Sequence, residues 1–361
     1  MRILVVSGAT GGHIFPALAF LDSLRQQDQN IETLLILPKR NILGKEITRD
    51  YKIRYISMSP IKFSFSFKNI KGAFNFLKAS LKSIFILIEF CPDTVVGFGS
   101  LSSLPIVLFA WIFRIKTMIH EQNVFPGRAN TFLAPFVDRI AISFGETERF
   151  LKQYRRKIVV TGNPLRSSLK IIEKTKALEF FQFSQSKFTI LVMGGSLGSS
   201  KINQSFQGAL FNMWNKNNLQ VIHLGGAKDY GYLKDSYKNL GVDVRIFDFL
   251  DSMQYAYSAS DLVIARAGAL TIAEIIFFKL PAILIPYPYA HKHQAVNADM
   301  LGRMKSALII PDDKLDTEAL KDAIEEFMRN PDKLKNMRLQ YNKSPSKDAG
   351  ALLVELAASL N

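Results

Sequence analysis

The sequence of 361 residues has one cysteine, Cys91, and no Asp-x-Asp pair. A single cysteine excludes a disulfide framework within the chain and is typical of proteins from reducing compartments. The missing Asp-x-Asp pair removes a common carboxylate device for holding a divalent cation on a nucleotide. His291 and His293 have neither a cysteine partner nor H-E-x-x-H spacing, so they do not form a zinc motif. We therefore expect no metal and no cofactor.

Long apolar runs are missing too. The longest, residues 104–113, ends at Arg114, well short of the roughly 20 residues that cross a bilayer. The chain begins with MRILVVSGATGG, the pattern of a strand and a glycine turn, where an exported protein has a charged segment and a cleavable apolar one. We expect neither an export signal nor a membrane-spanning helix.

The sequence does have a large apolar fraction and a strong positive charge. With 48% hydrophobic residues at this length it can bury two separate cores, so two domains are expected. Lysine and arginine number 46 against 31 acidic residues, which gives a formal net charge of +15. Such a chain attracts nucleic acid, anionic lipid or phosphorylated substrates.

Short apolar strands alternate with helical patterns along the whole chain, which predicts parallel α/β sheets. The pattern pauses near residues 161–164 and restarts at 188 with a strand and a glycine turn like those of the N-terminus. We therefore predict two Rossmann-like domains, 1–163 and 164–344, and a helix at about 345–361 that packs back on the first domain. The expected strands are residues 3–6, 33–37, 94–98, 117–119, 139–142 and 157–160, then 189–193, 219–223, 242–247, 261–264, 282–285 and 307–309.

Two strand-to-helix turns, residues 8–12 and 194–198, are rich in glycine. Neither matches the G-x-G-x-x-G fingerprint or the P-loop. Glycine lets the backbone approach a phosphate closely, and Thr10 or Ser196 adds a hydroxyl beside helix N-terminal amides. One such turn is more often a product of tight packing. Three of them, counting residues 266–268, favour phosphorylated ligands.

The third turn leads into a helix that should start near Ala269 and carry Glu274 in its second turn. Glu274 has two interpretations. It accepts both hydrogen bonds of a ribose diol, as the acid of dinucleotide folds does, or it completes a capping box with Thr271. Arg166, at the junction of the two halves, is either a bidentate ligand for a diphosphate or a surface arginine.

A basic aromatic stretch lies between residues 60 and 90, with five lysines against one acid. Five apolar residues at helical spacing (Phe74, Leu77, Leu81, Ile84 and Ile88) predict an amphipathic helix with this face buried on the sheet. The remaining aromatics suit a contact with anionic lipid. RNA stacking is the competing interpretation, but the sequence contains no RNA-binding motif. The expected membrane contacts are Phe63, Phe65, Phe67, Lys68, Lys71, Lys78, Lys82, Trp111 and Arg114.

Five motifs occur in order along nearly the whole chain: GATGGHIFPALA at 8–19, HEQN at 120–123, TGNPLR at 161–166, GGSLGSSKIN at 194–203 and ARAGALTIAEI at 265–275. Together they resemble the MurG family of peptidoglycan synthesis. These GT-B glycosyltransferases, with two Rossmann-like domains facing a cleft, transfer N-acetylglucosamine from its UDP donor to the 4-hydroxyl of the muramyl sugar of lipid I and form lipid II. The resemblance implies a peripheral enzyme on the cytoplasmic face of the bacterial inner membrane, with no nucleic acid partner.

The resemblance also implies a role for each matching residue. Glu274 would bind the ribose, Leu250 would offer its backbone to uracil with Phe249 beside the ring, and Gln294 and Asn123 would contact the sugar. The implied donor-binding residues are Thr10, Gly11, Gly12, Asn123, Arg166, Ser196, Phe249, Leu250, Ala269, Leu270, Thr271, Ile272, Ala273, Glu274 and Gln294. Those for the acceptor diphosphate are Gly11, Gly12, His13, Gly97, Gly99 and Ser100. The chain departs from the family at His293, where glutamine is usual, and in the loop 97–103, which is poorer in glycine.

An inverting transfer needs a base for the acceptor hydroxyl and stabilisation of the departing UDP. Helix amides, Ser196 and Arg166 would stabilise the leaving group without a metal. His13 is the preferred base, because its ordinary pKa suits proton transfer near neutrality, and Glu121 is the alternative. The competing functions are another GT-B enzyme, such as a glycolipid glycosyltransferase or a UDP-sugar epimerase, and a non-enzymatic RNA- or membrane-binding protein.

Overall fold

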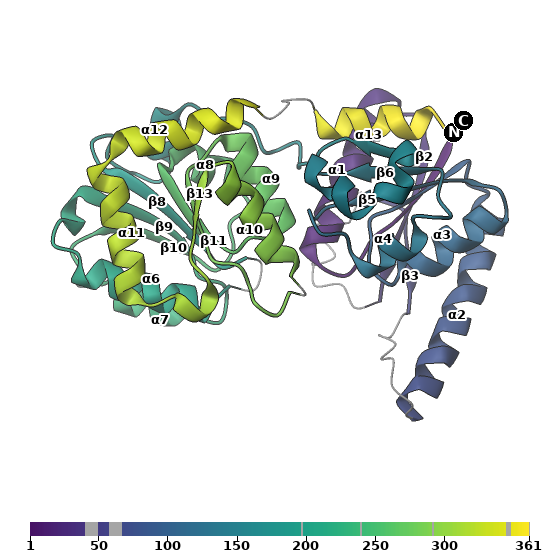
Figure 1. The fold of residues 1–361 in the computed structure, drawn as a ribbon, viewed down its shortest axis with the longest axis horizontal. Coiled ribbons are helices and arrows are strands. Elements are labelled where there is room, and N and C mark those ends of the chain that lie inside the picture. The colour runs from purple at the N-terminus through teal and green to yellow at the C-terminus, as the bar shows by residue number, and fades with distance from the viewer. Residues whose placement is uncertain are drawn as a thin grey trace. The chain divides into compact units, whose positions relative to one another are not determined.

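The computed structural model describes residues 1–39, 50–57, 67–195, 198–238, 240–290, 292–343 and 348–360, with the backbone alone at 67–73 and 343 (Figure 1). The chain forms two compact units. The first comprises Met1–Ser167 and Lys347–Asn361, and the second comprises Ser168–Ser346. The first unit therefore contains both chain ends and Arg166.

The first unit is built on a seven-stranded parallel sheet of order β3-β2-β1-β4-β5-β6-β7. Its strands are β1 (Arg2–Val6), β2 (Glu32–Pro38), β3 (Ile53–Ile56), β4 (Thr94–Gly97), β5 (Lys116–Glu121), β6 (Arg139–Ile142) and β7 (Ile158–Val160). Its helices are α1 (Gly11–Gln27), α2 (Phe67–Phe90), α3 (Ser103–Ile112), α4 (Arg128–Leu133) and α13 (Ala349–Ala358), with 3-10 turns at Gly145–Phe150 and Lys152–Lys157. Six of these strands were predicted, and β3 was missed.

The second unit has a six-stranded parallel sheet of order β10-β9-β8-β11-β12-β13. Its strands are β8 (Phe188–Met193), β9 (Leu219–Leu224), β10 (Asp243–Phe247), β11 (Leu262–Ala265), β12 (Ala282–Leu284) and β13 (Ala307–Ile309). Its helices are α5 (Lys174–Phe180), α6 (Ser200–Asn212), α7 (Tyr230–Ser236), α8 (Met253–Ala259), α9 (Ala269–Phe278), α10 (His293–Arg303), α11 (Thr317–Arg329) and α12 (Pro331–Gln340), with 3-10 turns at Lys216–Asn218, Asp312–Lys314 and Tyr341–Lys343. All six strands predicted for this half are present, which confirms the doubly wound α/β class.

Both faces of the first sheet are covered by apolar helices. On one face, the C-terminal helix α13 packs beside α1, and Leu353, Val354 and Ala357 join the same buried cluster as Phe20 and Leu24. Figure 1 shows α13 lying along this unit, next to α1. Burial of a side chain as large as Leu353 or Val354 contributes roughly 1.5 to 3 kcal/mol. Helix α13 therefore stabilises the first unit.

The prediction for the buried face of α2 was wrong. Phe74, Leu77, Leu81 and Ile88, expected to pack on the sheet, are 54 to 63% exposed. The helix instead buries a neighbouring face of Ala79, Ser80, Ser83, Ile86 and Leu87. Small side chains let α2 approach α3 closely, so the bulkier stripe is left outside, and Figure 1 shows the first half of α2 standing clear of the sheet.

Candidate functional site

Each sheet has a point where the strand order reverses, between β1 and β4 in the first unit and between β8 and β11 in the second. In open parallel sheets of this kind, ligands bind in the crevice at the carboxyl ends of the strands at that switch point. Residues 7–10 and 98–102 follow β1 and β4, and residues 194–199 and 266–268 follow β8 and β11. The predicted glycine turns thus lie where the fold creates binding crevices.

The His13 ring lies between the two loops of the first switch point. A Cβ atom on Gly8 would come within 3.0 Å of the ring and 2.7 Å of the Ser100 Cβ. One on Gly99, whose φ is +78°, would come within 3.2 Å of the ring. Both positions favour glycine, because a side chain at Gly8 would clash with Ser100 and one at Gly99 would crowd the His13 ring in a backbone conformation that suits glycine.

His13 is held by the turn that precedes α1. Its Nδ1 atom lies 2.9 Å from the Thr10 hydroxyl, one turn earlier in the helix. Thr10 is the N-cap residue of α1, yet its hydroxyl caps no backbone amide. The His13 amide donates to the Thr10 carbonyl at 3.0 Å, whereas Thr10 leaves the helix start without a side-chain cap, an arrangement that favours an anionic ligand, as the sequence predicts.

Serines replace glycine in the second loop of this switch point and tie it down. The Ser102 hydroxyl donates to the Ser7 carbonyl at 2.9 Å, and the Ser103 hydroxyl donates to the Ser100 carbonyl at 2.7 Å. Ser100 itself has a φ of +70°, in the region where glycine costs least. Gly99 and Ser100 therefore both have left-handed backbone conformations in this loop.

Glu121 is enclosed by the loop that follows it. The side chain is 2% exposed. Its Oε1 accepts from the backbone and side-chain nitrogens of Asn123, at 2.9 and 3.3 Å, and its Oε2 accepts from the Gly127 amide at 2.9 Å and the Asn130 amide at 2.7 Å. Both carboxylate oxygens thus hold the loop that carries Asn123.

His120 is fully buried beneath this loop and ties it to the 161–166 segment. Its Nε2 atom lies 3.0 Å from the Gly162 carbonyl, and its Nδ1 atom lies 3.0 Å from the Gln122 side-chain nitrogen. Burial lowers the pKa of this imidazole to about 4, so it is neutral at physiological pH, with Nε2 donating and Nδ1 accepting. The HEQN motif is thereby built around a hydrogen-bonded core.

Asn163 and Arg166 follow this contact. The Arg166 guanidinium lies 4.8 Å from the centre of the Phe15 ring, so its charge lies beside α1. Within the described part of the chain, the buried Arg166 Nε and both amide atoms of Asn163 have no hydrogen-bond partner. Asn163 is 6% exposed, and its side chain was not singled out from the sequence.

In the second unit, the loop after β8 lies against a neighbouring backbone. A Cβ atom on Gly198, whose φ is +75°, would meet the Gly225 carbonyl at 2.3 Å. Ser199 caps α6 by accepting from the Ile202 amide. Ser196, predicted to bind the diphosphate, lies outside the described residues.

Arg266 contacts the loop that follows β8. One guanidinium nitrogen donates to the Ser199 hydroxyl at 2.9 Å, while the other contacts the Ile285 carbonyl and forms an ion pair with Asp312. The side chain is 8% exposed. Three protein groups thus accept from Arg266, which links the turn after β11 to the loop after β8.

Helix α9 begins at Ala269, as predicted, with Gly268 as its N-cap and no side-chain cap. Thr271 lies inside the helix, so the capping-box interpretation of Thr271 and Glu274 is wrong: a capping serine or threonine must precede the first helical residue. Glu274 is 7% exposed, and its Oε2 accepts from the Tyr257 hydroxyl at 2.7 Å. Sequence reasoning missed Tyr257, which lies 17 residues earlier.

Other donor candidates of the second unit lie in the loop after β10 and at the start of α10. Phe249 is 50% exposed in the loop after β10, next to Leu250. Gln294, in the first turn of α10, accepts from the Tyr287 amide at 2.9 Å. Ile272 is fully buried, so its side chain could not face a ligand. The backbone amides in the first turn of α9, from Ala269 onward, could do so.

A buried histidine stabilises the second unit in the same way that His120 stabilises the first. The His223 imidazole lies 2.8 Å from the Tyr237 hydroxyl and 3.1 Å from the Asn203 carbonyl oxygen. Asn203, in turn, donates to Asp229 and to the Gly225 carbonyl. Burial lowers the pKa of His223 to about 3.

Because of these two buried histidines, we predict that the folded protein loses stability in mild acid. Their folded pKa values, about 4 and about 3, lie below the roughly 6.5 of an unfolded histidine. As the pH falls below about 6.5, these two histidines become protonated in the unfolded chain but stay neutral in the folded chain. The free energy of unfolding therefore falls by about 1.4 kcal/mol per pH unit for each histidine. Melting temperatures measured at pH 7.5 and 5.0 should show this decline, and His223→Gln should show a smaller one. An equal decline in the variant would assign it to other groups.

Of the candidates for membrane contact, Phe63 and Phe65 lie outside the described residues, and only the backbone is described at Phe67, Lys68 and Lys71. Lys78 and Lys82 are exposed on α2, and Trp111 is 44% exposed at the end of α3, before Arg114. The side chains of Ile112, Phe113 and Phe132 are 44 to 54% exposed on the same unit. With the stripe of α2, they give this unit many large exposed apolar groups.

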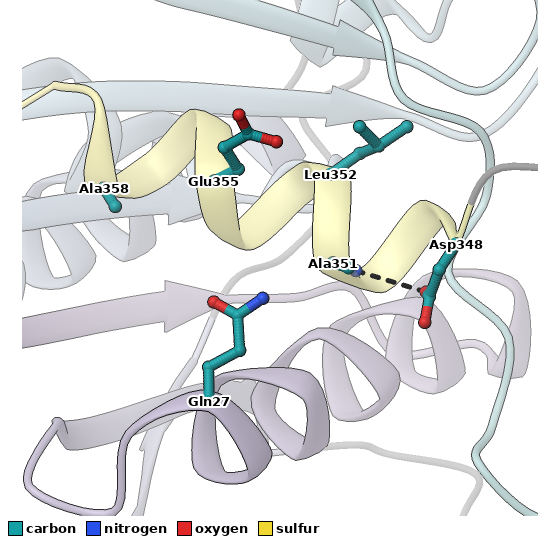
Figure 2. A pocket seen from close by; sticks show the side chains of 6 residues that line it. All are labelled: Gln27, Asp348, Ala351, Leu352, Glu355 and Ala358. Atoms are coloured by element: carbon teal, nitrogen blue, oxygen red, sulfur yellow. Dashed lines mark hydrogen bonds between the residues drawn. The ribbon is translucent and has the colours of Figure 1, made fainter.

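The described residues contain no cluster of three or more potential metal ligands, and none of their helices is long and apolar enough to cross a bilayer. A hollow of about 650 Å³ lies between α1 and α13. Figure 2 shows Gln27 facing α13 while Asp348 turns to the Ala351 amide. Gln27 ends α1, about 24 Å along the helix from Gly11, so this hollow is separate from the glycine loops.

Comparison with known proteins gives consistent matches over the full chain. The model of the glycosyltransferase family 28 N-terminal domain matches residues 3–142, and that of the C-terminal domain matches residues 189–353. The chain is 35% identical to the UDP-N-acetylglucosamine--N-acetylmuramyl-(pentapeptide) pyrophosphoryl-undecaprenol N-acetylglucosamine transferases of Thermodesulfovibrio yellowstonii and Bacillus subtilis, covering 100% of this chain and 99% of each relative.

Its fold is similar to the crystal structure of MurG from Acinetobacter baumannii, with a TM-score of 0.78 and 24% identity over 99% of both chains. That similarity confirms the GT-B architecture. Together with the full-length identity to the two transferases, it shows that this chain belongs to the MurG family of glycosyltransferase family 28.

Proposed function

We infer that this chain transfers N-acetylglucosamine from UDP-N-acetylglucosamine to lipid I, forming lipid II for peptidoglycan. The observation that supports this function best is full-length membership of a family whose relatives carry that activity in their names. The two switch points agree with it, because each places a glycine turn or an uncapped helix N-terminus where a phosphorylated substrate can bind. The chain is thus a hexosyltransferase.

For the donor, we propose that Glu274 binds the ribose, the first turn of α9 the phosphates, and the Leu250 backbone the uracil, with Phe249 beside it. A buried carboxylate on an uncapped helix supports this, since both groups lie at one switch point. Ser196, Arg166, Gln294 and Asn123 would complete the donor contacts. The assignment of residues 164–344 as the donor domain and 1–163 as the acceptor domain stays a prediction.

For the acceptor diphosphate, we propose the loops that enclose His13: residues 10–12 and the backbone of Gly97, Gly99 and Ser100. Their support is the uncapped start of α1 beside a loop with left-handed φ values at Gly99 and Ser100. His13 would take the proton from the attacking hydroxyl. Glu121 suits this role less well, because both of its oxygens already accept hydrogen bonds from its own loop.

We further propose that α2 rests on an anionic membrane surface. Its exposed residues Phe74, Leu77, Leu81, Phe85 and Ile88 form one apolar stripe, because their spacing of three and four residues keeps them on one helix face. Lys78 and Lys82 flank it and can meet anionic headgroups. Nucleic acid is a poorer fit, since its binding faces are dominated by cations. The enzyme would then be peripheral on the cytoplasmic face of the bacterial inner membrane.

A double substitution, Leu81→Glu with Phe85→Glu, is expected to weaken binding to anionic vesicles about 100-fold. Each lost apolar side chain removes roughly 1.5 to 3 kcal/mol of burial in lipid, and the new charges repel the surface. Vesicle co-sedimentation measures the effect. The matched control is Phe211→Glu with Leu339→Glu, which makes the same exchange at exposed positions of the second unit. Equal binding by both variants would remove α2 from the contact.

The activity itself is tested with purified protein, labelled UDP-N-acetylglucosamine and a lipid I analogue. Label should appear in lipid II. Release of free N-acetylglucosamine alone, or its conversion to the 2-epimer, would replace this function with hydrolysis or with the epimerase alternative. Transfer to a lipid that lacks the muramyl sugar would favour another glycolipid transferase.

A further inference from the structure

Tyr257 makes a contact with Glu274 that the sequence does not suggest. Its side chain is 1% exposed on α8, and its hydroxyl donates to the Glu274 Oε2 atom at 2.7 Å. The Tyr257 ring stacks on Phe278, at 4.9 Å between centres and 18° between planes. Packing thus fixes the ring, and the ring aims the hydroxyl at the carboxylate.

The position of this hydroxyl is specific. It lies 3.7 Å from the sulfur of Met193, the last residue of β8 and the one before the glycine turn. The hydroxyl therefore joins α8, α9 and the carboxyl end of β8 at the second switch point. A buried hydroxyl costs free energy unless it is hydrogen-bonded, and a phenylalanine would fill the same space without that cost. The tyrosine is best explained by what its hydroxyl does to Glu274.

We propose that Tyr257 is a positioning residue that sets the Glu274 carboxylate for the ribose diol of the donor. The inference rests on the proposed donor role of Glu274. A carboxylate has about four acceptor positions, so one hydrogen bond from Tyr257 is compatible with two more from a diol. That bond helps to fix the rotation of the carboxylate plane before the nucleotide binds.

The same helix links the two parts of the nucleoside site. Met253, the first residue of α8, lies three residues after Leu250, the proposed uracil contact, and its amide donates to the Asp251 carbonyl at 2.9 Å. Tyr257 follows one turn later on α8. Base and ribose recognition are therefore coupled through one short buried helix, and a change at Tyr257 should affect the nucleoside part of the donor more than its diphosphate.

The test compares UDP with 2′,3′-dideoxy-UDP as ligands of the full-length protein and of Tyr257→Phe, by calorimetry. Loss of one hydrogen bond to a charged group is expected to weaken UDP binding roughly tenfold. Binding of the dideoxy analogue should change less than about twofold, because it lacks the diol that Glu274 would hold. In steady-state assays, KM for the sugar nucleotide should rise by the same factor while kcat stays within about twofold.

The matched control is Tyr255→Phe, the same exchange on the same helix, where the ring stacks on Phe180 instead. It should leave both affinities unchanged. Equal weakening of UDP and of the dideoxy analogue in Tyr257→Phe, or no weakening of either, would overturn the positioning role. Failure of the underlying donor assignment looks different: the unmodified protein and Glu274→Ala would then bind UDP and its dideoxy analogue alike, whatever Tyr257→Phe does.

Discussion

Glu274→Ala is expected to raise the dissociation constant for UDP-N-acetylglucosamine by about 100-fold or more. The substitution removes two hydrogen bonds between a buried carboxylate and the ribose diol, and bonds to charged groups contribute roughly 1.5 to 3 kcal/mol each. Stability should change less. The lost partner of the buried Tyr257 hydroxyl costs about 1 to 3 kcal/mol, which lowers the melting temperature by roughly 2 to 12 °C in a unit of this size.

Glu325→Ala provides the matched control. Glu325 lies on α11 in the same unit, is 8% exposed, and pairs with Arg329. Removing it should lower the melting temperature by a similar amount and leave donor affinity unchanged. Calorimetry with UDP measures the donor affinity of both variants, and thermal unfolding measures their melting temperatures. A large loss of stability in Glu274→Ala with unchanged donor affinity would make Glu274 a structural residue of α9.

The start of α9 was predictable because its signals are local. An apolar strand, a turn with glycine and an apolar helix follow each other within 20 residues, and the helix begins at Ala269 as expected. The partner of Glu274 was not predictable, since Tyr257 reaches it only after α8 and α9 pack together. The HEQN motif shows the same limit: its sequence marks Glu121 as a possible base, but the four hydrogen bonds to that carboxylate exist only in the folded loop.

The face of α2 was predicted wrongly for a related reason. Helical periodicity indicates that one face is apolar, but it does not say what covers that face. In α2 the buried face combines the small side chains of Ala79, Ser80 and Ser83 with Ile86 and Leu87, and the bulky stripe faces outward. Strand β3 escaped prediction because Ile53–Ile56 is a four-residue edge strand interrupted by a charged residue, Arg54.

His13→Ala is expected to lower kcat about 10²- to 10⁴-fold, the usual contribution of a general base, with donor affinity unchanged. Its ring lies between Gly8 and Gly99, so truncation leaves a slot of imidazole shape between the two loops. Added imidazole should therefore restore part of the activity. Single-turnover transfer to the lipid I analogue, with and without imidazole, measures both effects.

Glu121→Gln separates the two candidate bases. The new NH2 group would replace one carboxylate oxygen and face groups that now donate to it, either Asn123 at Oε1 or Gly127 and Asn130 at Oε2. Its activity and its melting temperature should therefore fall together, because the loop loses its anchor. His13 is half-buried, so His13→Ala should lose turnover without that loss of stability. If His13→Ala kept most of its turnover at unchanged donor affinity while a stably folded Glu121→Gln lost it, the base would be Glu121.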